Sequence, residues 1–338
     1  MDSGLALRAP RNDVMSDTGP LFVSSGDAIA DRRYKWALDH ATRGDFSGAA
    51  DILVQALELA PGFATAWFAL GAIRDRLGDR EAAIAAFEKV RAADREDYHG
   101  ARLQLARLGA GDATPAMTPT YVRRLFDQYA ARYDVSLTEH LAYRGPALLR
   151  DAVEAVARTT ERPLRFGSVL DLGCGTGLAG AVFRPFADWL VGVDLSPAMI
   201  DRAAAKGLYD RFITADVAAA LADEAANGAK YHLIIAADVF VYVNELAPII
   251  ADVARVLALD GTFAFTVETH AGDGVKLLPT LRYAHGETYL RATLRNAGLT
   301  VASLAQASVR SEKGVPVDSL IVVAQVSTAP SPPASSRA

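Results

Sequence analysis

The sequence predicts an α/β protein in which a doubly wound, mostly parallel, seven-stranded sheet follows a separate all-α region. Short apolar segments alternate with helical patterns over residues 146–327, as expected for a parallel sheet covered by helices. A repeat with a period of 34 residues lies within residues 27–110 and predicts paired helices. A glycine-rich stretch, SVLDLGCGTGLAG at 168–180, follows the first apolar segment and marks a ligand-binding turn.

Composition and charge exclude several classes of protein. Of 338 residues, 51% are hydrophobic and 22% charged, which is typical of a globular protein that buries a core. The net charge is −5 with acids and bases interspersed, so we expect no nucleic-acid partner. The single cysteine, Cys174, excludes an intrachain disulfide and disfavours a zinc site, so we expect no metal.

The hydrophobic pattern predicts a cytoplasmic protein without a membrane partner. The most apolar run, YHLIIAADVFVYV at 231–243, contains His232 and Asp238 and is too short and polar to span a bilayer. The N-terminal segment has no long apolar core and therefore no visible secretory signal. Residues 1–26 and the Pro/Ser-rich tail at 328–338 have the composition of disordered ends.

The 34-residue repeat defines the helical region at 27–110. GDFSGAA at 44–50 aligns with GDREAAI at 78–84, and the second unit has Trp67 and Phe87 to fill the space between two helices. The small residue Gly71 permits their close approach. Arg33 stands where the first unit would need its tryptophan, and YHGARLQLARLG at 98–109 is expected to cap the stack. The region resembles tetratricopeptide repeats (TPR), which implies docking of a partner protein or a second copy; direct substrate binding is the alternative.

Residues 111–145 are expected to form a linker and a covering helix. GAGDATPAMTPT at 109–120 is rich in Gly, Thr and Pro, as linkers are. In YVRRLFDQYAARYD at 121–134, a spacing of four places Leu125, Tyr129 and Tyr133 on one helical face. A further helix is expected at 144–159.

The α/β domain is expected over 146–327. Its seven strands are predicted from the apolar segments at 166–172, 189–195, 211–216, 231–237, 262–268, 300–310 and 318–326. Helical patterns lie at 196–207, 217–228, 244–261 and 286–299. The last two strands are expected to form an antiparallel pair that closes one edge of the sheet.

The glycine loop at 173–177 indicates a ligand at the carboxyl ends of the strands, because glycines permit unusual backbone angles and close approach. Residues 175–180 satisfy the G-x-G-x-x-G pattern of dinucleotide sites, with Asp194 at the ribose-binding distance. The alternative ligand is S-adenosylmethionine (AdoMet), which carries an ammonium and a sulfonium. Asp171 at the loop entrance would repel a pyrophosphate and attract an ammonium. At about 4 Å and an effective dielectric of about 20, each interaction amounts to about 4 kcal/mol before desolvation is subtracted. The negative charge of Asp171 therefore favours AdoMet over a nicotinamide cofactor.

From residue 120 to 326 the chain resembles the class I AdoMet-dependent methyltransferases, which have a Rossmann-like sheet. VLDLGCGTG at 169–177, LVGVDLSPAMIDRA at 190–203 and ITADV at 213–217 occur in that family's order and spacing. The resemblance implies AdoMet as the cofactor and methyl transfer as the reaction.

The resemblance also implies roles for individual residues. Asp171 would hold the amino-acid end of AdoMet, and Asp194 would accept hydrogen bonds from both ribose hydroxyls. Asp216 would receive the adenine amino group. The other expected contacts are backbone and apolar ones from Gly173, Gly175, Gly177, Leu195, Met199 and Val217. Two alternatives stay open: Asp194 as a helix cap, and Met199 as ordinary core.

The segment FDQYAARYD at 126–134 resembles the N-terminal element of the methyltransferase branch that includes the quinone-synthesis and biotin-precursor enzymes. In that branch it lies over the cofactor, so Tyr129 and Tyr133 would cover the methionine end. An amphipathic helix packed on the sheet is the alternative.

The sequence says less about the methyl acceptor than about the cofactor. The fourth strand segment lacks the Asn/Asp-Pro-Pro-aromatic pattern of enzymes that methylate bases or glutamine. Asp238, Glu268 and His285 are the catalytic candidates: Asp238 follows the fourth predicted strand, Glu268 ends the fifth, and His285 belongs to LRYAHGETY at 281–289 before the last helix. Surface positions or helix caps are the alternatives. His285, with Arg282 nearby, suits an anionic or hydroxylated acceptor.

We therefore expect a methyltransferase acting on a small-molecule or carrier-bound acceptor, most simply by O-methylation. A second hypothesis is a protein methyltransferase whose TPR region holds the substrate protein. A third is a binding scaffold that holds AdoMet without catalysis.

Overall fold

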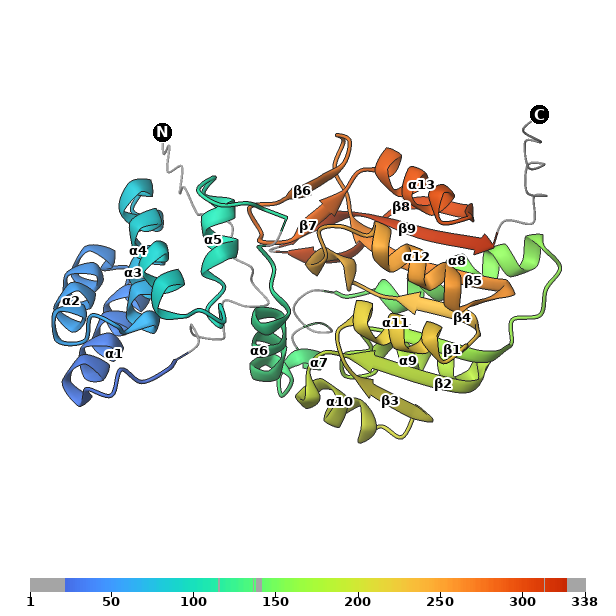
Figure 1. Ribbon diagram of the computed structural model, residues 1–338, viewed down its shortest axis with the longest axis horizontal. Coiled ribbons are helices and arrows are strands. Elements are labelled where there is room, and N and C mark those ends of the chain that lie inside the picture. The colour runs from blue at the N-terminus through green and yellow to red at the C-terminus, as the bar shows by residue number, and fades with distance from the viewer. Residues whose placement is uncertain (1–21, 115, 136, 138–141, 313, 327–338) are drawn as a thin grey trace, which may run out of the picture.

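The computed structural model describes residues 22–114, 116–135, 137, 142–312 and 314–326. A helical N-terminal region and an α/β domain lie side by side, with helix α6 (Pro119–Tyr129) between them (Figure 1). The expectation of disordered ends at residues 1–21 and 328–338 lies outside the described residues.

The helical region contains two antiparallel helix pairs and a shorter fifth helix. Their bounds are α1 (Ala28–Thr42), α2 (Phe46–Leu59), α3 (Ala64–Arg76), α4 (Arg80–Ala93) and α5 (Ala101–Arg107). The repeated Gly-Asp pair explains the turns. Gly44 and Gly78 adopt φ values of +87° and +82°, which suit glycine after a helix. Asp45 and Asp79 then cap α2 and α4 by accepting a backbone N–H with the side chain.

Gly71 on α3 lets this helix approach α4 closely. A Cβ at Gly71 would lie 2.8 Å from the ring of Phe87, which is itself fully buried. Trp67 is partly buried, and its Nε1–H donates to the carbonyl of Pro61 at 2.8 Å. The close approach expected at Gly71 is therefore present, but the ring that packs against Phe87 is that of Phe68, at 5.4 Å. Trp67 instead packs against the core formed mainly by α1, α2 and α3.

The expectation of disorder up to residue 26 is wrong for residues 22–26. The ring of Phe22 lies 5.5 Å from that of Tyr34 and 6.3 Å from that of Phe63. The backbone N–H of Val23 donates to Oγ1 of Thr65 at 3.0 Å. These contacts attach the segment to α1 and α3, and the sequence has no periodic pattern here from which to expect them.

Among the residues that the structure describes, the α/β domain is built on one sheet of nine strands. Their bounds are β1 (Phe166–Leu172), β2 (Ala187–Asp194), β3 (Arg211–Thr214), β4 (Tyr231–Ala236), β5 (Leu257–Glu268), β6 (Val275–Leu277), β7 (Tyr283–His285), β8 (Leu299–Glu312) and β9 (Val315–Val326). Strands β3, β2, β1, β4 and β5 are parallel in that order. Strand β9 pairs antiparallel with β5 and β8 with β9, as expected for the closing pair. The predicted fold class is confirmed, with the short β6–β7 hairpin as an addition to the seven expected strands.

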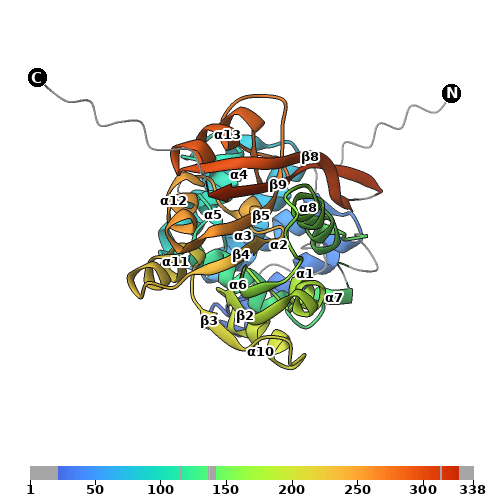
Figure 2. The same ribbon diagram turned by 90° about the vertical axis from the view of Figure 1, so that its right-hand side faces the viewer.

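Helices cover both faces of the sheet (Figure 2). One face packs against α11 (Val217–Ala226), α12 (Ala247–Val256) and α13 (Glu287–Asn296), and the other against α8 (Gly145–Thr159) and α9 (Leu178–Phe183). Along β4, Ile234 and Ala236 point to the first face, whereas Leu233 and Ile235 point to the second. All four are fully buried, which explains why the positions 233–236 are all apolar.

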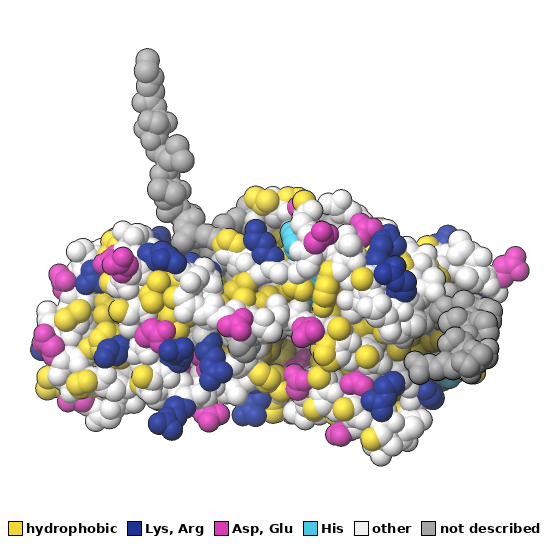
Figure 3. Space-filling view, turned by 45° about the horizontal axis from the view of Figure 1, so that its top comes forward, with side chains coloured by type: hydrophobic (Ala, Val, Ile, Leu, Met, Phe, Trp, Pro, Cys, Tyr) yellow, Lys and Arg dark blue, Asp and Glu magenta, His cyan; other side chains and the backbone are white. Residues whose placement is uncertain are grey.

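The remaining elements are short. They are α7 (Tyr133–Val135), α10 (Pro197–Ala204) and the 3-10 turns η2 (Arg184–Phe186) and η3 (Phe240–Tyr242). On the face shown in Figure 3, basic and acidic side chains are interspersed among hydrophobic ones. Within the described ranges, no helix has the length and apolar character needed to cross a bilayer.

Candidate functional site

The glycine loop between β1 and α9 follows an unusual backbone path. Gly173, Gly175 and Gly177 have φ values of +65°, +54° and +91°. At Gly173 a Cβ would lie 2.5 Å from the Val239 side chain, so glycine is needed there for packing. At Gly175 the nearest neighbour of such a Cβ is Tyr133 at 3.8 Å, so this backbone is open on one side.

A cavity of about 130 Å³ lies beside this loop, where β1, β2, β3 and β4 end. Nine of the residues expected at the site line it: Tyr133, Gly173, Gly175, Asp194, Leu195, Met199, Asp216, Val217 and Asp238. The lining residues that were not expected come from the segment before α6, from α6, from the loop after β4 and from α12: Met117, Pro119, Val122, Phe126, Ala237, Val239, Tyr242, Val243 and Ile249.

Asp194 lies at the end of β2 and bridges two backbone segments. Its Oδ2 accepts the N–H of Gly175 and its Oδ1 accepts the N–H of Ser196, each at 2.8 Å. Burial raises the pKa of this carboxyl to about 6, although the two backbone hydrogen bonds oppose the rise. Ser196, and not Asp194, is the N-cap of α10, because its hydroxyl accepts the N–H of Met199.

Asp216 caps the next helix at the same end of the sheet. Its side chain accepts the N–H of Ala218 at 2.9 Å as the N-cap of α11. Val217 follows directly, and Leu195 and Met199 form an apolar part of the wall. Met199 is almost fully buried, so the cavity exposes only a small part of it.

Asp171 and Gly177 are not among the cavity-lining residues. The carboxylate of Asp171 is fully buried, and its Oδ2 accepts a hydrogen bond of 2.6 Å from the Tyr209 hydroxyl. Burial raises the pKa of Asp171 to about 7. Its Oδ1 has no partner among the described residues. The cavity therefore meets the carboxylates of Asp194, Asp216 and Asp238 instead.

The two tyrosines of the covering segment lie at different depths. Tyr133 lines the cavity, whereas Tyr129 lies behind it with the two rings perpendicular and 5.8 Å apart. The segment is tied to the α/β domain by the hydroxyl of Ser196, which donates to Asp127 at 2.6 Å. Lys206 pairs with Asp134 at 2.8 Å.

Of the three catalytic candidates, Asp238 alone lines the cavity. It follows β4 with a φ of +61°, a strained value for a residue other than glycine. Both of its oxygens accept hydrogen bonds from Nη1 of Arg310, at 2.6 and 2.7 Å. Its charge is therefore paired with a cation that is itself fully buried.

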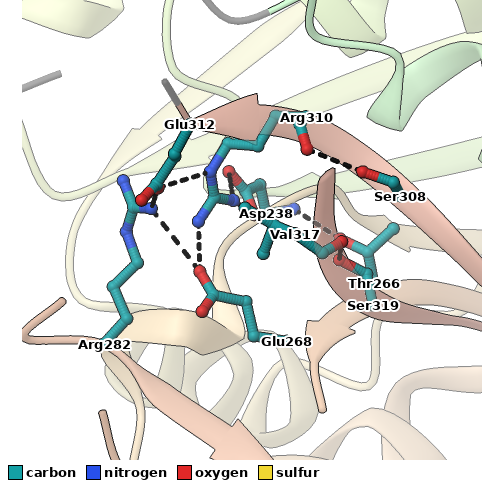
Figure 4. A network of polar contacts seen from close by, with 9 residues as sticks. All are labelled: Asp238, Thr266, Glu268, Arg282, Ser308, Arg310, Glu312, Val317 and Ser319. Carbon is teal, nitrogen blue, oxygen red and sulfur yellow. Dashed lines mark hydrogen bonds and ion pairs between the residues drawn. The ribbon is translucent and has the colours of Figure 1, made fainter. Parts of the chain in front are cut away.

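Glu268 lies in a buried ionic cluster beyond the cavity wall (Figure 4). It pairs with Arg310, and Nη1 of Arg282 lies 3.5 Å away. Glu312 pairs with both arginines. Burial raises the pKa of Glu268, while the two guanidinium groups act in the opposite direction.

His285 is fully buried and does not line the cavity. Its Nε2 lies 3.0 Å from the carbonyl oxygen of Val243, a residue of the cavity wall. Burial lowers the pKa of the ring to about 4, so it stays neutral near pH 7 and donates from Nε2. The structure thus places His285 behind the wall as a support for the loop after β4.

A second, smaller cavity of about 20 Å³ shares Phe126, Tyr133, Asp238 and Tyr242 with the first. Its other lining residues are Leu125, Tyr129, Leu137, Arg282 and Arg310. Sequence reasoning missed Arg310, which comes from β8 near the C-terminus, because nothing in its local sequence distinguishes it from a surface arginine.

Comparison with known proteins identifies both regions. Residues 169–261 match the family described as "Methyltransferase domain", and residues 41–108 match "Tetratricopeptide repeat". The chain contains a methyltransferase domain preceded by a TPR region. Both predictions are confirmed.

Individual relatives match part of the chain. Human methyltransferase-like protein 27 is 36% identical over 107 residues, which are 31% of this chain and 41% of that protein. The bovine 18S rRNA (guanine-N(7))-methyltransferase is 54% identical over 35 residues, 10% of this chain and 12% of that protein. The chain thus matches less than half the length of these curated relatives.

A solved structure similar to this chain is magnesium protoporphyrin IX methyltransferase (ChlM) from Synechocystis PCC 6803 with bound SAM. The TM-score is 0.45 at 21% identity, covering 62% of this chain and 97% of that one.

Proposed function

We propose that this protein is an AdoMet-dependent methyltransferase that transfers a methyl group by in-line displacement to an oxygen of a small-molecule or carrier-bound acceptor. The observation that carries the proposal is the cavity beside the glycine loop. It gathers the open backbone of Gly175 and the carboxylates of Asp194 and Asp216 at the ends of successive strands. This is the edge of an α/β sheet at which ligands bind.

The residues of the cavity fit AdoMet. Each oxygen of Asp194 accepts one backbone N–H, which leaves lone pairs for two ribose hydroxyls. Leu195, Met199 and Val217 offer an apolar surface for a purine. The missing side chain of Gly175 leaves room for close approach of the cofactor.

The charges at the cavity favour AdoMet over a nicotinamide cofactor. Three carboxylates line it, and among the described residues that line it none is Lys or Arg. A pyrophosphate would be repelled by Asp194 and Asp216, whereas an ammonium and a sulfonium would be attracted to them; the charge of Asp238 is already paired with Arg310. The charge argument made for Asp171 from the sequence thus applies better to Asp194 and Asp216.

The chemistry asks little of the protein beyond position and exclusion of water. AdoMet supplies an activated methyl group with its leaving group in place. Phe126, Tyr133 and Tyr242 would shield this end from solvent, with the rings of Phe126 and Tyr242 perpendicular at 5.2 Å. Arg282 and Arg310 line the adjoining smaller cavity, where they are paired with Asp238, Glu268 and Glu312.

The contact between the TPR region and α6 favours a second candidate, a protein methyltransferase. The guanidinium of Arg124 on α6 lies 4.3 Å from the ring of Tyr98. Gly100 packs against Tyr121 so closely that a Cβ would lie 2.6 Å from its ring. A substrate protein held by the repeats would therefore lie next to the helix that lines the cavity. In the alternative, the surface of the repeats would pair two copies of the chain.

The test uses AdoMet labelled in its methyl group. Calorimetry with AdoMet and with a nicotinamide cofactor should show binding of the first alone; binding of the second alone would contradict the proposal. When the full chain is then incubated with labelled AdoMet and a cell extract, the label should enter the small-molecule fraction. Entry into protein would favour the second candidate, and AdoMet binding without any transfer would indicate a scaffold.

A further inference from the structure

The smaller cavity has a size and position that suit one end of a methyl acceptor. Its volume of about 20 Å³ holds about one water molecule or a small end group. It adjoins the larger cavity through Phe126, Tyr133, Asp238 and Tyr242. A group placed in it would therefore lie beside the ligand of the larger cavity.

Arg310 in the wall of this cavity has partners for all three of its nitrogens. Nη1 donates to both oxygens of Asp238, Nε donates to Glu312 at 3.2 Å, and Nη2 donates to Glu268. Its role is therefore to hold these carboxylates in place (Figure 4).

Arg282 differs from Arg310 in one respect. Its side chain is only 3% exposed, and Nη1 pairs with Glu268 and Glu312. Its Nε–H, however, is buried without an acceptor among the described residues. A guanidinium carries only donors, and leaving a buried donor without a partner is destabilising. An oxygen atom from a ligand in the cavity would remove this destabilisation.

The residues of the cavity wall limit which kind of ligand oxygen could accept the N–H of Arg282. A hydroxyl acceptor must lose its proton to a base, whereas Asp238 and Glu268 beside this wall are both ion-paired with buried arginines. A carboxylate is already ionised at neutral pH and needs no base. An ammonium carries only donors and could not accept the N–H of Arg282.

We propose that Arg282 marks a carboxylate subsite and that the acceptor is a carboxylic acid, which rests on the proposed function. One carboxylate oxygen attacks the methyl carbon of AdoMet, so that a C–O bond forms as the S–CH₃ bond breaks. The electron pair of that bond stays on sulfur. The products are a methyl ester and S-adenosylhomocysteine, with no proton transfer and no redox change.

The experiment saturates the full chain with S-adenosylhomocysteine and titrates it with propionate, propionamide and propylamine. We expect propionate to bind at least tenfold more tightly than propionamide, and propylamine to show no binding. In Arg282→Lys the charge remains but the Nε–H is lost, so propionate should bind at least tenfold more weakly. Arg291→Lys is the matched control, because Arg291 pairs with Glu287 on the surface of α13.

Methyl transfer gives a second readout that does not depend on any variant folding. Label transferred by the wild-type chain in a cell extract should be released as methanol by mild base, as methyl esters are. Base-stable label, equal binding of propionate and propionamide, or tightest binding of propylamine would overturn the carboxylate subsite. Failure of S-adenosylhomocysteine to bind would instead overturn the proposed function.

Discussion

The backbone N–H of Gly175 donates a hydrogen bond of 2.8 Å to Oδ2 of Asp194, 19 residues further along the chain. This bond joins the glycine loop after β1 to the end of β2. The loop is also held by the N–H of Cys174, which donates to the carbonyl of Val193 at 2.8 Å. The residue that would bind the ribose therefore also fixes the loop that would face the cofactor.

Asp194→Ala should weaken AdoMet binding at least tenfold, or about 1.4 kcal/mol, in a calorimetric titration. The change removes the ribose acceptor and also the partner of Gly175. Asp201→Ala is the control, since Asp201 is exposed on α10 and outside the cavity lining. An unchanged dissociation constant for Asp194→Ala would contradict the ribose assignment.

Gly175→Ala should abolish AdoMet binding at concentrations that saturate the wild type. A methyl group at Gly175 would project toward the cavity, where its nearest neighbour is Tyr133 at 3.8 Å. Gly207→Ala is a matched control: Gly207 has a φ of +65°, and a Cβ added there would meet no atom within 4 Å. Both variants bear a backbone strain of about 1–2 kcal/mol, so both should lose a similar few degrees of Tm. If Gly207→Ala also lost AdoMet binding, backbone strain and not the methyl group at Gly175 would be the cause.

Asp171→Asn should stabilise the protein at pH 8 and have little effect near pH 4. The folded-state pKa of about 7 lies above the unfolded value of 3.8, so the folded state keeps this proton longer. Stability contributed by Asp171 therefore falls as pH rises from about 4 to 7, by up to about 4 kcal/mol in total. Asparagine does not titrate, so the variant does not lose this stability as the pH rises.

Urea unfolding at pH 4, 6 and 8 measures the effect of Asp171→Asn. The exposed Asp201→Asn should show the same stability as wild type at all three values. A constant difference between Asp171→Asn and wild type across pH would show that Asp171 is ionised throughout. If Asp171 also holds the ammonium of AdoMet, the stabilised variant should bind AdoMet more weakly.

The cofactor side of the site could be predicted from sequence because its residues come directly after strands. Asp194 and Asp216 each follow an apolar segment and lie just before a helix, and parallel strands bring such ends to one edge. Asp171 shows the limit of this reasoning. It also occurs at a strand end, but the alternation of side chains along β1 points it into the protein toward Tyr209.

The acceptor side could not be predicted because it depends on contacts between distant segments. Asp238 and Arg310 are 72 residues apart, and their pairing follows from the way β8 returns along the edge of the sheet. Arg282 belongs to the loop before the short strand β7, which no periodic pattern indicates. The helical region was easier to predict, because its Gly-Asp turns repeat in the sequence itself.

Tyr133→Ala should weaken AdoMet binding about tenfold, because Tyr133 covers the open side of Gly175 and lines both cavities. Tyr129→Ala is the comparison: Tyr129 lines the smaller cavity and only supports Tyr133 from behind. We expect it to change the AdoMet dissociation constant less than threefold, with a larger loss of stability because Tyr129 is buried. Calorimetry and urea unfolding of both variants separate the two roles. Equal losses of affinity would show that the covering segment acts as one unit, with neither tyrosine in direct contact with the cofactor.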